Sequence, residues 1–177
     1  MANKEKFRCG QMGNTDFLWL SPLGYISVCL SAEAVCRISF QEGNFGNVWP
    51  PDHALAREVI RQLNAYFEGK LRAFSLPLSP GGSVFQNQVW DAVCRIPYGS
   101  TVSYSALSRE IGLPDAIRAV AGAIASNPLL LVIPCHRVTG STGKLTGYSG
   151  GLDRKRKLLE LERRFVVYGK STLFKHD

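Results

Sequence analysis

Residues 131–138 read LVIPCHRV, an apolar run that meets a proline and ends in a cysteine, a histidine and an arginine. The apolar half predicts a buried strand. A thiol, an imidazole and a guanidinium in succession stabilise a hydrophobic core poorly. At the end of a buried strand, however, the rigid backbone can hold a nucleophilic side chain in a fixed position. This stretch therefore predicts cysteine chemistry at Cys135, with His136 beside it.

Around this stretch the composition is that of an ordinary globular chain. Of 177 residues, 45% are hydrophobic and 20% are charged, which suffices for a sizeable core in one domain or two small ones. The longest apolar run, Leu129–Ile133, is too short to span a bilayer, and the N-terminus leads into no signal-peptide core. We therefore expect a cytoplasmic protein with no membrane partner.

Positive charge is concentrated in the C-terminal part of the chain. The net charge is +7, and the residues from Ser83 onward hold 13 Lys and Arg against 7 Asp and Glu, whereas those before it hold 8 against 7. This imbalance favours a polyanionic partner for the C-terminal part, although a solvated basic surface has the same composition.

The N-terminal part predicts a small antiparallel sheet followed by a helix. Apolar runs separated by turn residues indicate strands at 17–20, 25–30 and 35–40. A helix should begin after Pro50 and end near Gly69, since its apolar residues recur every three or four positions. Residues 76–83 are rich in Pro and Gly and read as a linker. We therefore predict two domains, at 1–80 and 83–177.

The C-terminal part predicts a helix at 84–93 and then a helix-turn-helix at about 103–126, with its second helix opened by Asp115. That second helix is mostly Ala and Gly, with one long base, Arg118. Such a surface lets a backbone come close but offers little hydrogen bonding to base edges in the major groove. A buried, Ala-rich packing helix is an equally good interpretation of these residues.

A last helix, predicted at 153–165, supplies a third polar residue. Leu158, Leu161 and Phe165 form its expected buried stripe, and Glu162 falls on the same side. A carboxylate on an apolar face needs a partner, and His136 is the natural candidate. Cysteine, histidine and glutamate would then form a triad. The alternative is that the cysteine is a small buried hydrophobe and the histidine a satisfied polar residue.

The PCHRV motif at 134–138 has companions along the chain. RAVAGA lies upstream at 118–123, NP at 127–128, and GYSGGL downstream at 147–152. Together these motifs closely resemble the O6-alkylguanine-DNA alkyltransferases, also called methylated-DNA–protein-cysteine methyltransferases. The resemblance is strong from about Val84 to Glu162, whereas over residues 1–80 only the general layout is similar.

The resemblance implies an α/β (α+β) fold class, with a ribonuclease-H-like N-terminal domain of sheet and helix. A mainly helical, winged-helix-like domain would follow, and its helix-turn-helix would enter the minor groove of DNA. The implied partner is double-stranded DNA containing O6-alkylguanine, bound by a monomer. The damaged nucleotide would be flipped into a pocket and its alkyl group passed irreversibly to the cysteine, with O4-alkylthymine as a further candidate substrate. No cofactor is implied, and the location would be the nucleoid or, in a eukaryote, the nucleus.

Roles for single residues follow from the same resemblance. Cys135 would be the alkyl acceptor, His136 the base that acts through a water, and Glu162 the carboxylate behind the histidine. Asn127 would brace the active-site turn, and Tyr104 would donate its hydroxyl toward N3 of the guanine.

The resemblance also implies residues that contact DNA and the substrate. Arg118 would fill the space that the flipped nucleotide leaves in the duplex, a device of proteins that kink DNA from the minor groove. The other implied contacts are Ala119, Gly122 and Ala123 for DNA, and Val138, Tyr148, Ser149 and Gly150 for the substrate pocket.

Some members of this family bind a structural zinc ion in the N-terminal domain through cysteines and histidines. This chain has Cys9, Cys29, Cys36 and His53 there, but no compact pair of ligands. We therefore predict no metal site.

Three other functions fit some of these features. A non-catalytic module that binds and flips alkylated bases would need no acceptor cysteine, whereas this chain has Cys135. A cysteine hydrolase would use the same Cys, His and Glu, although hydrolases seldom place the nucleophile and the base side by side. A helix-turn-helix regulator is disfavoured by the nearly bare second helix.

Overall fold

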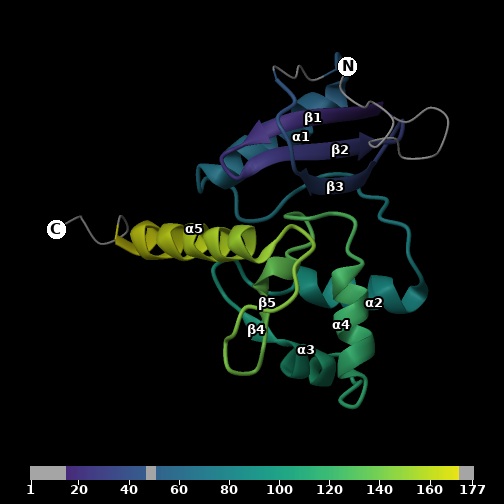
Figure 1. Cartoon of the computed structure of the whole chain (residues 1–177), viewed down its shortest axis with the longest axis vertical. Helices are drawn as coiled ribbons and strands as arrows, with labels where there is room; N and C mark the ends of the chain where they lie inside the picture. Colours follow the sequence, from purple (N-terminus) through teal and green to yellow (C-terminus); the bar gives the residue numbers. More distant parts are fainter. Residues whose placement is uncertain (1–14, 47–50, 172–177) are drawn as a thin grey trace. The chain divides into compact units, whose positions relative to one another are not determined.

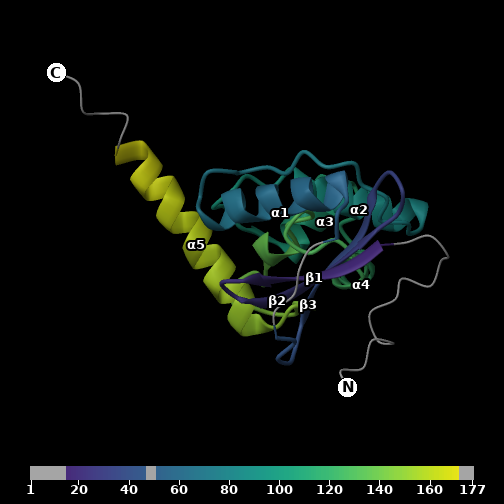
Figure 2. The same cartoon turned by 90° about the horizontal axis from the view of Figure 1, so that it is seen from above.

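The computed structural model describes residues 15–46 and 51–171 (Figures 1 and 2). The chain forms two compact units, one made of residues 1–81 and 128–130, the other of residues 82–127 and 131–177. No helix in the described part of the chain combines the length and the apolar character needed to cross a membrane.

The first unit is built on a three-stranded antiparallel sheet. Its strands β1 (Thr15–Ser21), β2 (Gly24–Leu30) and β3 (Val35–Gln41) lie side by side in chain order (Figure 1). Ser21 pairs with Gly24, so a two-residue turn joins β1 to β2, and the Ser21 hydroxyl donates to the carbonyl of Gly24 at 2.6 Å. The predicted sheet is confirmed.

Helix α1 (Ala54–Phe67) packs against this sheet. It buries Val59, Leu63 and Tyr66 at the spacing of one helical face, and it lies along one side of the sheet (Figure 2). The Phe67 ring meets the Trp19 ring of β1 with centroids 5.9 Å apart. The predicted helix is confirmed.

The outer edge of β3 is covered by two short segments of the chain. Val35 donates its N–H to the carbonyl of Pro77 at 2.8 Å, and further along the strand Ile38 donates to the carbonyl of Pro128 at 2.8 Å. Leu130 returns a bond to the carbonyl of Ile38 at 3.0 Å. This pairing is why residues 128–130 belong to the first unit, and it removes the open edge that β3 would otherwise present.

The second unit is mainly helical. Its elements are α2 (Val84–Cys94), β4 (Val102–Ser103), α3 (Tyr104–Glu110), α4 (Ile117–Ala125), the 3₁₀ helix η2 (Cys135–Arg137), β5 (Val138–Thr139) and α5 (Leu152–Ser171). Strands β4 and β5 pair in parallel. The Trp90 indole of α2 donates to the carbonyl of Ala123 at 2.7 Å and so ties α2 to α4.

Helices α3 and α4 form the predicted helix-turn-helix. Gly112 follows α3 with a φ of +77°, a conformation that favours glycine. Helix α4 begins at Ile117, two residues beyond the predicted start at Asp115.

The prediction of a strand before Cys135 is wrong. Leu131 has a φ of +74°, and the Cys135 N–H donates to the carbonyl of Ile133 at 2.8 Å across Pro134, whose φ and ψ are −81° and 57°. These values define an inverse γ-turn. The run is apolar because it is enclosed, as the burial of Leu131 and Ile133 shows. A short apolar run does not by itself distinguish a strand from another buried segment.

Helix α5 is longer than the predicted 153–165, and its buried stripe differs from the prediction. Leu158 and Glu162 are buried as expected, but Leu161 and Phe165 are only half-buried. Lys155 occupies the stripe instead and is fully buried. A lysine was not expected there because charged side chains are rarely buried without a partner.

Candidate active site

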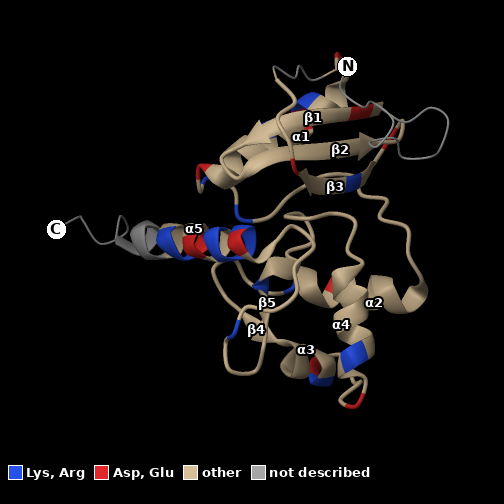
Figure 3. Ribbon diagram, viewed as in Figure 1, with Lys and Arg blue, Asp and Glu red and all other residues tan. Residues whose placement is uncertain are grey.

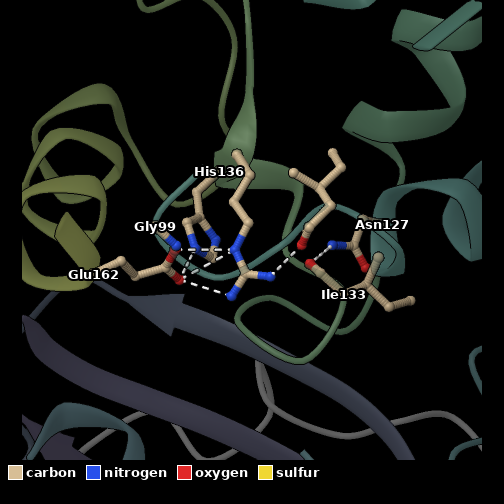
Figure 4. Close-up of polar contacts among 7 residues, drawn as sticks. Gly99, Asn127, Ile133, His136 and Glu162 are labelled. Atoms are coloured by element: carbon tan, nitrogen blue, oxygen red, sulfur yellow. Dashed lines mark hydrogen bonds and ion pairs between the residues drawn. The ribbon is translucent and has the colours of Figure 1, made fainter. Parts of the chain in front are cut away.

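The 3₁₀ helix η2 carries three buried polar side chains in succession, those of Cys135, His136 and Arg137. The turn before η2 is held by Asn127, whose Nδ2 donates to the carbonyl of Ile133 at 2.8 Å and to the Sγ of Cys135 at 3.1 Å. One amide group therefore fixes both the backbone of the turn, through the bond to Ile133 drawn in Figure 4, and the position of the thiol.

The carboxylate of Glu162, on α5, accepts hydrogen bonds from several residues of this part of the site (Figure 4). Its Oε1 lies 2.9 Å from the Nε2 of His136, and its Oε2 accepts the backbone N–H of Gly99 at 2.9 Å. Gly99 has a φ of +75°, and a Cβ there would lie 2.6 Å from a methyl carbon of Val166. Only glycine therefore allows this approach, which brings a backbone donor to a buried carboxylate.

Arg137 supplies the counter-charge for Glu162. Its Nη2 donates to Oε1 at 2.9 Å and its Nε donates to Oε2 at 3.0 Å, so the guanidinium binds the carboxylate in a bidentate manner. Its Nη1 donates to the carbonyl of Ile96 at 2.8 Å, and the guanidinium lies 5.5 Å from the centre of the Tyr98 ring. The sequence analysis missed this role, although Arg137 stands next to His136 in the chain.

These contacts set the charge of Glu162. Burial alone would raise the pKa of the carboxyl, but the hydrogen bonds and charges of His136 and Arg137 outweigh burial and hold the pKa at about 2. Glu162 is therefore ionised at neutral pH. An ionised carboxylate only accepts hydrogen bonds, so the proton of His136 is on Nε2 and the lone pair is on Nδ1.

The thiol and the imidazole are both uncharged at neutral pH. Burial raises the pKa of Cys135 to about 11, although the Asn127 amide and the Lys155 charge act against this rise. Burial also lowers the pKa of His136, despite its hydrogen bond to Glu162. The site therefore holds a thiol beside a neutral base, and the thiolate forms only when a proton is removed.

Lys155 is a second buried cation that the sequence analysis missed. Its Nζ donates to the carbonyls of Val138, Thr146 and Gly147 at 2.6, 2.7 and 3.2 Å. The three donors of one ammonium group thus tie β5 to the loop that follows it. Burial lowers the pKa of Lys155 to about 8. Its spacing from Leu158 and Glu162 places it on the same face of α5, which was the available signal.

A cavity of about 350 Å³ opens onto Cys135. Helices α3 and α4 form one wall and the loop after β5 forms the other. The lining residues are Tyr104, Ala121, Ile124, Ala125, Cys135, Thr146, Gly147, Tyr148 and Ser149. Cavities of this size hold small ligands in proteins. The structure thus brings Tyr104, Tyr148 and Ser149 together around the thiol, whereas the three α4 residues were not foreseen.

Two predicted pocket residues lie behind the cavity wall rather than on it. Val138 and Gly150 are buried, and the cavity lining among the described residues does not include them. The carbonyl of Val138 accepts from Lys155, and that of Gly150 accepts from Arg154 at 3.1 Å. The Tyr104 hydroxyl lies on the cavity and donates to the carbonyl of Thr146 at 3.4 Å.

Helix α4 presents a smooth outer face. Arg118, Ala119 and Gly122 are exposed, and a Cβ on Gly122 would meet nothing within 4 Å. Ala123, which is also predicted to contact DNA, is only 4% exposed, and its carbonyl accepts the Trp90 indole N–H. Ala125 is exposed instead. Most of α4 carries no charge, in contrast to α5 (Figure 3).

Residues 15–46 and 51–171 contain no group of three or more His, Cys, Asp or Glu side chains placed to hold a metal ion. Cys9 lies outside the described residues. The absence of a zinc site therefore stays a prediction.

Two family models match the chain. The 6-O-methylguanine DNA methyltransferase, DNA binding domain, matches residues 84–164, and the 6-O-methylguanine DNA methyltransferase, ribonuclease-like domain, matches residues 18–80. A methylated-DNA–protein-cysteine methyltransferase from Methanosarcina barkeri is 46% identical over 146 residues, which cover 80% of this chain and 92% of that protein. One from Mycobacterium tuberculosis is 42% identical over 146 residues, with 81% and 88% covered.

Solved structures of this family are also similar to the chain. The crystal structure of Mycobacterium tuberculosis OGT in complex with DNA matches with a TM-score of 0.75 and 42% identity, over 84% of this chain and 92% of that one. The O6-methylguanine-DNA methyltransferase of Pyrococcus kodakaraensis matches with a TM-score of 0.53 and 21% identity, over 84% of this chain and 98% of that one. At that identity the second match supports the fold alone.

We predict that Glu162→Gln changes how stability depends on pH. The carboxyl pKa is about 2 in the folded chain against its usual 4.5. The ionised form therefore stabilises the fold above pH 4.5, and this contribution is lost as the pH falls toward 2. About 2 kcal/mol of it is lost by pH 3. Urea unfolding from pH 7 to pH 3 should show the wild type losing about that much more than the variant.

At neutral pH the same variant should be less stable than the wild type by about 3 kcal/mol, because Arg137 keeps its buried charge without a counter-ion. The control is Glu110→Gln, which removes an exposed partner of Arg95 and should change stability by less than about 0.5 kcal/mol. Parallel pH curves for the wild type and Glu162→Gln would contradict this account of the site.

We also predict that Lys155→Met loosens the loop at 140–151. The variant keeps an unbranched apolar side chain but removes the Lys155 donor from three carbonyls, of which that of Thr146 keeps its 3.4 Å bond from Tyr104. The free energy of unfolding should therefore fall by about 2 kcal/mol or more. Deuterium uptake by peptides from the loop, measured by mass spectrometry, should rise. Lys157→Met, which removes an exposed partner of Asp153 on the same helix, is the control. Equal uptake in the two variants would refute the role given to Lys155.

Proposed function

Since this chain belongs to the 6-O-methylguanine DNA methyltransferase family, we propose that it repairs DNA by moving the alkyl group of O6-alkylguanine onto Cys135. The observation that carries the proposal is the position of the thiol. Cys135 lines a cavity of about 350 Å³ and stands beside a neutral histidine that Glu162 orients. A ligand in this cavity therefore meets the nucleophile, whereas His136 is fully buried behind the lining and would act through a water.

The proposed reaction is a direct displacement at the alkyl carbon. His136 takes the thiol proton through a water, the sulfur forms a bond to the alkyl carbon, and the bond from that carbon to O6 breaks. Negative charge develops on the departing purine, and the Tyr104 hydroxyl donates to N3 to stabilise it. The imidazolium of His136 then passes this proton, again through water, to the departing guanine, so atoms and charge balance.

Glu162 and Asn127 position the reacting groups in this scheme. The carboxylate holds His136 in the tautomer that has its lone pair on Nδ1 and stabilises the imidazolium as it forms, which is the logic of a catalytic triad. The Asn127 amide, 3.1 Å from Sγ, stabilises charge on the sulfur.

We propose that the protein acts once. The product is a thioether, and none of the described side chains that line the cavity with Cys135 is of a kind that cleaves a carbon–sulfur bond. The reaction as written needs neither a metal ion nor a cofactor. The protein is then consumed stoichiometrically as it repairs.

The proposal extends to how DNA is bound. The outer face of α4 offers Ala119, Gly122 and Ala125 for close approach to a duplex, with Arg118 at its N-terminal end. Such a face suits the minor groove, where a protruding side chain can replace a nucleotide that has been flipped out. We propose that a monomer binds duplex DNA in this way in the compartment that holds the genome. O4-alkylthymine is a second candidate for the cavity.

The experiment that tests the function is the mass of the intact protein after incubation with a duplex containing O6-methylguanine. We expect one methyl group per chain, located on Cys135 by peptide analysis, with guanine restored in the DNA. Cys135→Ser should abolish transfer, because a hydroxyl is far less ionised than a thiol. Cys94→Ser, which changes an exposed thiol, is the control and should still accept one methyl group. An unchanged mass after excess substrate would refute alkyl transfer and favour a non-catalytic binding module.

Arg118→Ala should slow repair of duplex DNA by at least tenfold while reaction with free O6-benzylguanine changes little. The reason is that a wedge matters only when a stacked nucleotide must leave the duplex. Both reactions can be followed as single-turnover rates of Cys135 alkylation. Arg57→Ala, at an exposed arginine of α1, controls for the loss of one positive charge. Equal losses on the two substrates would argue against the wedge.

A further inference from the structure

One tyrosine that lines the cavity, Tyr148, has a buried hydroxyl with no hydrogen-bond partner among the described residues. The other tyrosine of the cavity differs, because the Tyr104 hydroxyl already donates to the carbonyl of Thr146. Most buried hydroxyls in proteins are hydrogen-bonded, so each exception calls for an explanation.

The surroundings of Tyr148 keep this hydroxyl in place and protonated. Its ring meets the His136 ring edge to face, with centroids 6.3 Å apart, so it stands beside the proposed base. Burial raises the pKa of Tyr148 well above its usual value. The group is therefore a neutral donor at any physiological pH. A ligand oxygen that reaches this hydroxyl can accept a hydrogen bond from it, and no hydrogen bond between described residues of the chain has to break.

The path of the substrate leads past this hydroxyl. In the proposed reaction the first carbon of the substituent must reach the Sγ of Cys135, where it bonds to sulfur as its bond to O6 breaks and the thiol proton passes to the departing guanine. Any further atoms of the substituent must share the cavity with the residues around the thiol. Tyr148 and Cys135 line the same cavity, so Tyr148 is one of the side chains that a longer substituent can contact.

We propose that Tyr148 is a specificity-determining residue, whose hydroxyl selects O6-alkyl groups that carry a neutral oxygen beyond the transferred carbon. The substrate class is that of O6-hydroxyalkylguanines, of which O6-(2-hydroxyethyl)guanine is the smallest with an oxygen at this distance. An all-carbon group of the same length fills the same space and leaves the hydroxyl without a partner. This inference rests on the proposed alkyl transfer.

The test compares two substrates of nearly equal shape, duplexes with O6-(2-hydroxyethyl)guanine and with O6-propylguanine. Single-turnover rates of Cys135 alkylation are measured for the wild type and for Tyr148→Phe. The ratio of the hydroxyethyl rate to the propyl rate should fall roughly two- to tenfold in the variant, the range expected for one hydrogen bond. Comparison of ratios cancels the intrinsic reactivity of the two groups and any general effect of the variant on the site.

Tyr25→Phe is the matched control. It removes a tyrosine hydroxyl that bonds to Asn44 and Gly46 in the first unit, and its rate ratio should equal that of the wild type. A ratio for Tyr148→Phe equal to the wild-type ratio would overturn the proposal.

A second measurement does not depend on folding of the Tyr148 variant. In Cys135→Ala protein, which cannot react, the hydroxyethyl duplex should bind two- to tenfold more tightly than the propyl duplex, and equal affinity would count against the role of Tyr148. Failure of the proposed alkyl transfer and failure of the proposed selectivity of Tyr148 give different results in these experiments. If wild-type Cys135 accepts neither group, alkyl transfer fails, whereas transfer with unchanged ratios refutes only the selectivity.

Discussion

The second unit depends on one buried carboxylate, that of Glu162. Removing such a group from water costs several kcal/mol. Here the cost is offset by three donors from two segments, which are His136 and Arg137 of η2 and the backbone of Gly99. Burial is the main reason why the pKa of His136 is lowered and the ring stays neutral beside an ionised carboxylate, and the charge of Arg137 acts in the same direction. The ion pair of Arg137 and Glu162 therefore fixes the geometry of the site and also supports the neutral state of the base.

The nucleophile stands on an irregular stretch of backbone that its neighbours hold in place. Leu131 has a positive φ, which costs on the order of 1–3 kcal/mol for a residue with a side chain, and Pro134 turns the chain sharply before η2. On the N-terminal side, residues 128–130 pair with β3, and Asn127 bonds to both Ile133 and Cys135. On the C-terminal side, Lys155 anchors β5 to its loop. The thiol is thus positioned by hydrogen bonds to the backbone on both sides of it.

Features encoded by local pattern were predictable from the sequence, and features that depend on tertiary contacts were not. The three strands, α1, α2 and the helix-turn-helix follow from periodicity and turn residues. The pairing of His136 with Glu162 also follows, because the 100° spacing of a helix places the carboxylate on an inner face. The strand at 131–133, by contrast, was wrong, because positive φ at a leucine has no signal in the sequence. Lys155 and Arg137 were missed because charged residues are assigned to the surface by default, and only the folded backbone shows the carbonyls and the carboxylate that receive them.

Burial of the thiol suits a protein that reacts once. With a pKa of about 11 for Cys135, roughly one molecule in ten thousand holds a thiolate at pH 7. Electrophiles and oxidants in solution act on thiolates, so the resting site is nearly inert toward them. A lower pKa would speed the displacement but would also expose an irreplaceable residue to side reactions. In the proposed mechanism the proton moves to His136 while the carbon–sulfur bond forms, so reactivity arises only when the substrate fills the cavity. The Tyr148 hydroxyl is also buried, without a hydrogen bond to any described residue, so under the proposed selectivity its partner would be an oxygen of the substrate.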